Sequence, residues 1–198
     1  MLNHEWGRQN DYLRPNGQIY NTYPSLKPEQ DRQSLWDGTV TGEISTVATD
    51  GISTPLCVKV HGRRIDDTTG GNAGVELRLS VMYSEMVVKR GYSLERFVDF
   101  VSTNAARVMG LYPRKGAIAA GSDADIVVFD PSVKRKVRVE DLHEADYSPW
   151  EGYDISGWPD TTILCGKVVV DRGKFLGEAK GERIPRKIAD SIRSGPAC

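Results

Sequence analysis

The stretch that decides the fold is "STNAARVMGLYPRKGAIAAGSDADIVVFDP", residues 102–131, because its pattern changes from helix to strand within one short segment. The first part predicts a short helix that is capped near Ser102 or Thr103 and ends at Gly110. After "YPRKG" the helical spacing stops, and short β-branched runs separated by Gly and Asp turns follow. We therefore predict a boundary near Arg114, with helices before it and a small β-structure after it.

Upstream of this stretch the sequence predicts two further helices. In "VELRLSVMYSEMVVKRG", residues 75–91, apolar side chains recur three and four positions apart, and Gly91 is a suitable C-terminal stop. Ser93 is suited to cap the second helix. The predicted apolar faces consist of Leu79, Met82, Tyr83 and Met86 in the first helix and of Leu94, Phe97, Val98 and Val101 in the second.

The N-terminal third is polar, and its most informative segment is "ISTVATDG", residues 44–51. We predict an extended loop over the first forty residues that ends in a short helix, 29–36. A buried strand over 44–49 follows, and it stops on Asp50. A carboxylate at the tip of a buried strand needs hydrogen bonds, a cation or a metal. From the residues alone, a strand-end Asp that caps the following turn is the favoured interpretation.

Two segments lack a clear period. Residues 51–74 form a long stretch rich in turn formers, which is uncommon inside a compact domain and is usually functional. Beyond the boundary, 117–131 and 160–176 hold strand runs, whereas 143–160, "HEADYSPWEGYDISGWPD", reads as irregular. Neither half contains enough sheet to stand alone, so the chain reads as the end of something larger.

Composition excludes several classes of protein. The 198 residues carry a net charge of −1, so no basic surface for nucleic acid or anionic membrane is expected. No apolar run approaches the roughly 20 residues of a membrane helix, and the start has no signal-peptide core, which predicts a cytoplasmic protein. Cys57, Cys165 and Cys198 form no CxxC pair. We expect the first two to be inert packing residues and the third to be an exposed thiol.

Residues 102–131 resemble the dihydropyrimidinase and D-hydantoinase family of cyclic amidohydrolases. The likeness rests on the helix ending in Asn-Ala-Ala, on "GLYPRKG" and on "GSDADIV". It extends backward through "GNAGVELRLSVMYSEMV" and "VATD", and forward through "SPWEG" and "ILCGKVVVDRGKF". It covers about residues 12–183.

The resemblance implies an α/β fold, a metal-dependent (β/α)8 TIM barrel followed by a β-sandwich. On this basis 1–114 is the C-terminal segment of the barrel, 115–176 is the C-terminal part of the sandwich, and 177–198 is a tail. The segment "ISTVATD" then corresponds to the last barrel strand. Barrel enzymes place catalytic groups at the C-terminal ends of their strands, where Asp50 stands.

The resemblance also implies an activity, hydrolysis of the ring amide of hydantoins or dihydropyrimidines. Family members use two divalent metal ions, zinc in most cases, to lower the pKa of a bound water. Asp50 would be a metal ligand and the proton shuttle of this hydroxide. The complete family enzyme is expected to be a homo-oligomer, a tetramer, with no nucleic-acid or membrane partner.

The implied metal site is incomplete in this chain. The family site needs four His and one bridging carboxylated Lys from earlier barrel strands, whereas this chain has only His4, His61 and His143, with no His-x-His pair. We therefore expect that the isolated chain does not retain the metals and is inactive without the missing N-terminal barrel segment. The alternatives are a non-catalytic structural or assembly relative and a functionless gene fragment. The intact "VATD" favours the C-terminal part of a hydrolase over the non-catalytic relative, because a purely structural protein does not need this carboxylate.

The substrate contacts are partly recognisable. In "TYPSLK", residues 22–27, Tyr23 occupies a position where the family has a Ser whose backbone holds the cyclic amide. For a second backbone contact, ungapped matching gives Gly70, while Asn72 is the nearest Asn. The loop 59–72 looks closer to the hydantoinase-like branch, although the choice between hydantoin and dihydropyrimidine stays open.

Overall fold

The computed structural model describes residues 9–62, 64–177 and 181–195. The chain forms two compact units. The first unit comprises Met1–Arg78 and Arg135–Ile155, and the second comprises Leu79–Lys134 and Ser156–Cys198. Across the described ranges, no helix is long and apolar enough to cross a membrane.

The first unit contains short helices joined by long irregular segments. Its α-helices are α2 (Glu29–Thr41) and α3 (Leu56–Lys59), and its 3-10 helices are Gln9–Leu13, Gly17–Tyr20, Ile65–Asp67 and Val139–Asp141. A small apolar core lies between the N-terminal segment and a distant part of the chain, formed by Ile19, Tyr20, Leu26 and Tyr147.

The helix predicted over 29–36 is confirmed, and it is longer than expected. It follows Pro28 and runs to Thr41, where Gly42 adopts a φ of 85° and ends it. The strand predicted over 44–49 is wrong, because the described residues there form no regular structure. Val47 is buried all the same, with 4% of its surface exposed. A barrel strand needs a paired neighbour, and the described pairing here is a single parallel bridge between Gly51 and Asn72.

The helices of the second unit match the predicted positions closely. Helix α4 (Arg78–Met82) continues into a π-helix, Tyr83–Val88, and Gly91 follows with a φ of 69°. Ser93 caps α5 (Leu94–Val98) as predicted, since its side chain accepts a hydrogen bond from the backbone N–H of Arg96. Helix α6 (Asn104–Val108) comes next, and Gly110, with a φ of 68°, stands just beyond its end.

Two details of this prediction are wrong, and a π-helix at Asp99–Thr103 explains the first of them. The cap expected near Ser102 or Thr103 is wrong, because Thr103 is helical, with a φ of −62°. The predicted apolar face of this helix is also partly wrong. Phe97 is buried as predicted, whereas Leu94 and Val98, which precede the π-helix, are 58% and 47% exposed. Phe100, at the start of the π-helix, is buried instead.

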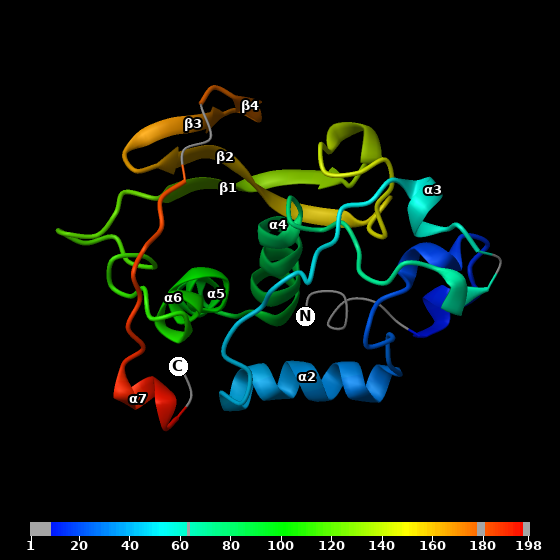
Figure 1. Ribbon diagram of the computed structural model, residues 1–198, viewed down its shortest axis with the longest axis horizontal. Coiled ribbons are helices and arrows are strands. Elements are labelled where there is room, and N and C mark those ends of the chain that lie inside the picture. The colour runs from blue at the N-terminus through cyan, green and yellow to red at the C-terminus, as the bar shows by residue number, and fades with distance from the viewer. Residues whose placement is uncertain (1–8, 63, 178–180, 196–198) are drawn as a thin grey trace. The chain divides into compact units, whose positions relative to one another are not determined.

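The second unit also holds most of a four-stranded sheet. Its strands are β1 (Ile126–Lys136), β2 (Asp154–Leu164), β3 (Lys167–Asp171) and β4 (Lys174–Phe175), in the order β1-β2-β3-β4 (Figure 1). Strands β2 and β3 are antiparallel, as are β3 and β4. The turn between β2 and β3 is Cys165-Gly166, both with positive φ, as right-twisted hairpins favour.

The segment 143–160 was predicted to be irregular throughout, and its last part is instead the start of β2. Gly157 and Pro159 lie inside this strand and hide the alternation that would indicate it. The glycine has a packing reason. A Cβ at Gly157 would lie 2.3 Å from the ring of Phe129, and its φ is 76°.

Three aromatic rings pack against one another in the second unit. Tyr83 meets Phe97 edge-on, with ring centroids 5.7 Å apart, and meets Phe129 at 5.1 Å. The Phe97 and Phe129 centroids are 6.3 Å apart. These rings connect the helices with β1 and lie within the range of favourable aromatic pairs.

The expected packing role of two cysteines is wrong. Cys57 on α3 and Cys165 in the β2–β3 turn are both exposed. The turn position explains Cys165, because its φ of 49° belongs to a hairpin loop rather than to a strand interior. Cys198 lies outside the described residues.

Candidate functional site

Asp50 stands at the end of an extended segment and is exposed. Its φ of 53° is left-handed, a conformation that Asp adopts more readily than most residues. The cap of the following turn is Thr49, whose Oγ1 accepts a hydrogen bond from the N–H of Gly51 at 3.2 Å. No described residue donates a hydrogen bond to the Asp50 carboxylate. Turn capping therefore does not account for this side chain.

Asn72 lies directly beside the Asp50 segment. Gly51 pairs with it, and the N–H of Ile52 donates to its carbonyl at 3.2 Å. Asn72 is 2% exposed, and its buried Oδ1 accepts no hydrogen bond from the described residues. The fold thus brings Asn72 next to Asp50 and leaves one buried polar atom there unsatisfied.

Tyr23 and Gly70 are also in contact. A Cβ at Gly70 would lie 2.1 Å from Cδ2 of the Tyr23 ring, so the ring rests against the glycine backbone. The tyrosine is 63% exposed, which leaves its other surfaces open to solvent. Since Gly70 and Asn72 are two positions apart, the segment 70–72 gathers all four residues singled out from the sequence.

Lys59 binds the backbone of both segments at this site, a role that was not predicted from the sequence. It is fully buried, and its Nζ donates to the carbonyl oxygens of Asn21, Thr69 and Gly71 at 2.6, 2.7 and 2.7 Å. Burial lowers the pKa of Lys59 to about 8, because removal from water disfavours the charged form. The three carbonyl oxygens stabilise that form and oppose the shift. A single lysine in an aperiodic loop gives no signal of such a role.

A second set of contacts ties a distant segment to the site. The Nδ1 of His143 lies 3.0 Å from Oε1 of Glu76, and its backbone N–H donates to Oε2 at 2.9 Å. Glu144 accepts from the Ser53 hydroxyl at 3.0 Å and from the N–H of Glu76 at 3.3 Å. The loops that follow Asp50 and Asn72 are therefore both held by residues 143–144.

The described residues do not form a metal centre by themselves. No group of three or more His, Cys, Asp or Glu able to hold a metal ion exists among the described residues. His61 pairs through Nδ1 with the carbonyl of Val58 at 3.0 Å, and His143 pairs with Glu76. His4 lies outside the described residues. Asp50 offers one carboxylate, which cannot hold two metal ions.

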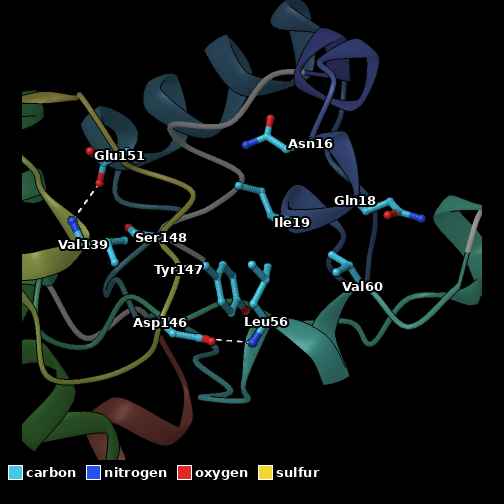
Figure 2. A pocket seen from close by; sticks show the side chains of 10 residues that line it. All are labelled: Asn16, Gln18, Ile19, Leu56, Val60, Val139, Asp146, Tyr147, Ser148 and Glu151. Atoms are coloured by element: carbon cyan, nitrogen blue, oxygen red, sulfur yellow. Dashed lines mark hydrogen bonds between the residues drawn. The ribbon is translucent and has the colours of Figure 1, made fainter.

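The first unit also contains a pocket of about 400 Å³, shown in Figure 2. Two of its carboxylates bind backbone N–H groups, Asp146 that of Leu56 and Glu151 that of Val139, each at 2.7 Å. Its lining is Asn16, Gln18, Ile19, Leu56, Val60, Val139, Asp146, Tyr147, Ser148 and Glu151. None of the residues singled out from the sequence lines this pocket. The predicted site residues, which meet at the segment 70–72, therefore do not belong to this pocket.

Known proteins that are similar to this chain indicate one family. The amidohydrolase family matches residues 12–169. A D-hydantoinase from Geobacillus stearothermophilus is 38% identical over 170 residues, which cover 83% of this chain and 36% of that protein. A D-phenylhydantoinase from Escherichia coli O1:K1 is 34% identical over 182 residues, covering 90% and 40%.

Solved structures agree. A dihydropyrimidinase from Brevibacillus agri superposes with a TM-score of 0.85 at 34% identity, over 89% of this chain and 39% of that one. An L-hydantoinase from Arthrobacter aurescens gives a TM-score of 0.81 at 30% identity, over 89% and 40%. The chain thus spans about two-fifths of the length of the relatives that it matches. It belongs to the amidohydrolase family, and its relatives there are hydantoinases and dihydropyrimidinases.

Proposed function

We propose that this chain acts as the C-terminal part of a cyclic amidohydrolase, which hydrolyses the ring amide of a hydantoin or a dihydropyrimidine. The names of the relatives support this substrate class, and both ring types occur among them. The proposal includes a TIM-barrel segment over 1–114, β-sandwich strands over 115–176 and a tail over 177–198. It also includes assembly with an N-terminal barrel segment and, in the complete enzyme, a homo-oligomer.

The observation that carries the proposal is the exposed Asp50 carboxylate, which has no described structural partner and stands beside the segment 70–72. A carboxylate that does no structural work is free to accept and return a proton. We assign Asp50 this role during ring opening. We also assign it as the one metal ligand that this chain adds to a site whose other ligands would come from the N-terminal barrel segment.

The same segment supplies groups suited to a cyclic amide, which presents an N–H donor beside a carbonyl acceptor. We propose that backbone groups of Tyr23 and of 70–72 bind these two. Between the candidates Gly70 and Asn72, the carbonyl of Asn72 is already paired with Ile52. Among the described residues, no backbone N–H donates to the carbonyl of Gly70. This difference favours Gly70 as the acceptor that remains for substrate.

The test is a hybrid enzyme, in which the part of the Geobacillus D-hydantoinase that this chain does not match is fused before this chain. We expect the hybrid to open a hydantoin or dihydrouracil in the presence of divalent metal, and the chain alone to open neither with the same metal added. Zinc content is measured on both proteins. Comparing the two rings identifies the preferred substrate.

Two outcomes would contradict the proposal. Metal-dependent ring opening by the chain alone would show that its own residues complete the site. A folded hybrid that binds metal and opens neither ring would instead support a non-catalytic relative kept for assembly.

A further inference from the structure

The ammonium of Lys59 joins the two segments that hold the proposed substrate contacts. One of its three acceptors, the carbonyl of Asn21, lies two positions before Tyr23. The other two, the carbonyls of Thr69 and Gly71, lie on either side of Gly70. A single buried group therefore fixes the backbone on both sides of the contact between the Tyr23 ring and Gly70.

The bonding of Lys59 is saturated by backbone alone. An ammonium has three donors, and all three are used at 2.6–2.7 Å. No carboxylate of the described chain pairs with it. Burying such a cation without a counter-ion is costly, and the three carbonyl oxygens supply the compensation. A neutral side chain of the same length could fill the space but could not draw three carbonyls to one point.

One weaker bond also joins the two segments, since the side-chain Nδ2 of Asn21 donates to the carbonyl of Thr68 at 3.3 Å. A further bond, from the N–H of Thr69 to the carbonyl of Lys59 at 3.3 Å, holds Thr69 against the backbone of the lysine itself. Both are longer than the three bonds of the ammonium, which are therefore the stronger link between the two segments.

We propose that Lys59 is a positioning residue for substrate binding, which sets the distance between the Tyr23 backbone and the segment 70–72. This inference rests on the function proposed above. Lys59 donates to neither the Asp50 carboxylate nor its neighbours Thr49 and Gly51. Its loss should therefore disturb how the ring is held and leave the proton-accepting group in place.

The first test uses the 198-residue chain itself and needs no activity. Backbone hydrogen exchange is compared in the parent chain, in Lys59→Met and in the matched control Lys27→Met. Lys27 is an exposed lysine whose Nζ, among the described residues, bonds only the Ser25 hydroxyl, at 3.2 Å. In Lys59→Met we expect amides in 20–26 and 68–76 to exchange about tenfold faster, with 94–108 unchanged. Lys27→Met should match the parent.

Unchanged exchange in both segments would overturn the proposal. So would a uniform rise over the whole chain, which would mark a general stabilising residue. If Lys59→Met does not fold, Lys59→Gln is measured in the same way, because its amide keeps two N–H donors. A uniform rise in that variant likewise overturns the proposal, and a rise confined to the two segments supports it.

The second test places Lys59→Met in the hybrid enzyme. We expect KM for the ring substrate to rise about tenfold or more while kcat stays within about threefold of the parent hybrid. A fall in kcat at constant KM would refute the assignment to substrate binding. If the parent hybrid is inactive, the proposed function fails, and the exchange data still decide whether Lys59 fixes the two segments.

Discussion

Each of the two units is stabilised internally by a different kind of contact. In the second unit, regular helices and strands pack through side chains such as Tyr83, Phe97 and Phe129. In the first unit, irregular segments are joined by polar bonds over long separations, for example 38 residues between Lys59 and Asn21 and 67 between His143 and Glu76.

This difference in contacts suggests that the second unit mainly provides stability and the first unit mainly carries the functional groups. Apolar packing between regular elements provides a scaffold that tolerates local change at its surface. Loops held by a few polar bonds can present exposed groups such as Asp50 and Tyr23, and a single substitution can displace them. Substitutions in the first unit should therefore act on binding and turnover, and those in the second unit on the free energy of unfolding.

The largest effect is expected for Asp50→Asn in the hybrid enzyme. The amide keeps the shape of the side chain but cannot accept the proton, so kcat should fall by roughly 10²–10⁴-fold. The matched control is Asp123→Asn in the second unit, where the carboxylate pairs with Arg114 and Lys115 at 2.9 Å. That variant should turn over normally. Steady-state kinetics with metal content decide, and a near-normal kcat at full metal occupancy in Asp50→Asn would remove its catalytic role.

Phe97→Ala should have the largest effect on the free energy of unfolding. Phe97 is 7% exposed and contacts two other rings, and truncating a buried Phe typically costs about 3–5 kcal/mol. The neighbouring Val98→Ala is the control, because Val98 is 47% exposed and should cost little. Urea unfolding monitored by hydrogen exchange at 94–108 measures both. Similar losses in the two variants would show that the difference in burial between Phe97 and Val98 does not decide stability.

Lys59 should give the chain a characteristic pH dependence. Its folded pKa of about 8 lies below the ordinary 10.5, so the folded state holds a disfavoured charge below pH 8. Between these values the unfolded chain binds more protons, and the free energy of unfolding should therefore rise with pH. The full shift corresponds to at most about 3 kcal/mol.

The measurement is the difference in unfolding free energy between the parent chain and Lys59→Met, from pH 8 to 10.5. Burial raises the pKa of Tyr12, Tyr20 and Tyr147, and these groups titrate in both chains, so their contribution cancels. A difference that stays flat or falls over this range would contradict the lowered pKa.

The smallest effect is expected at the helix cap. Ser93→Ala removes the bond from the N–H of Arg96 to the serine side chain, 3.2 Å long, and should cost about 1 kcal/mol. Ser102 was also a candidate cap, but it lies within a π-helix. Ser102→Ala should therefore change stability by only a few tenths of a kcal/mol. Equal losses in thermal unfolding would show that the helix restarts near Ser102 after all.

Local signals explain where the sequence reading succeeded. The cap at Ser93 and the stops at Gly91 and Gly110 depend on neighbouring residues only, and all three hold in the structure. The hairpin strands after 160 are likewise encoded by short β-branched runs between turn formers. The predicted cap near Ser102 is wrong because a π-helix continues through that position. The start of β2 was not predicted because Gly157 and Pro159 interrupt the alternation of the strand.

By itself, the sequence determined the family, the helices of the second unit and the identity of Asp50, Tyr23, Gly70 and Asn72 as candidates, because motifs and caps are short-range patterns. Only the tertiary structure showed that 70–72 gathers these residues, that Thr49 caps the turn after Asp50, and that Lys59 joins their segments. It also decided that no strand forms over 44–49. Such features depend on which distant backbone groups meet, and a carbonyl oxygen has the same chemistry at every position of the chain.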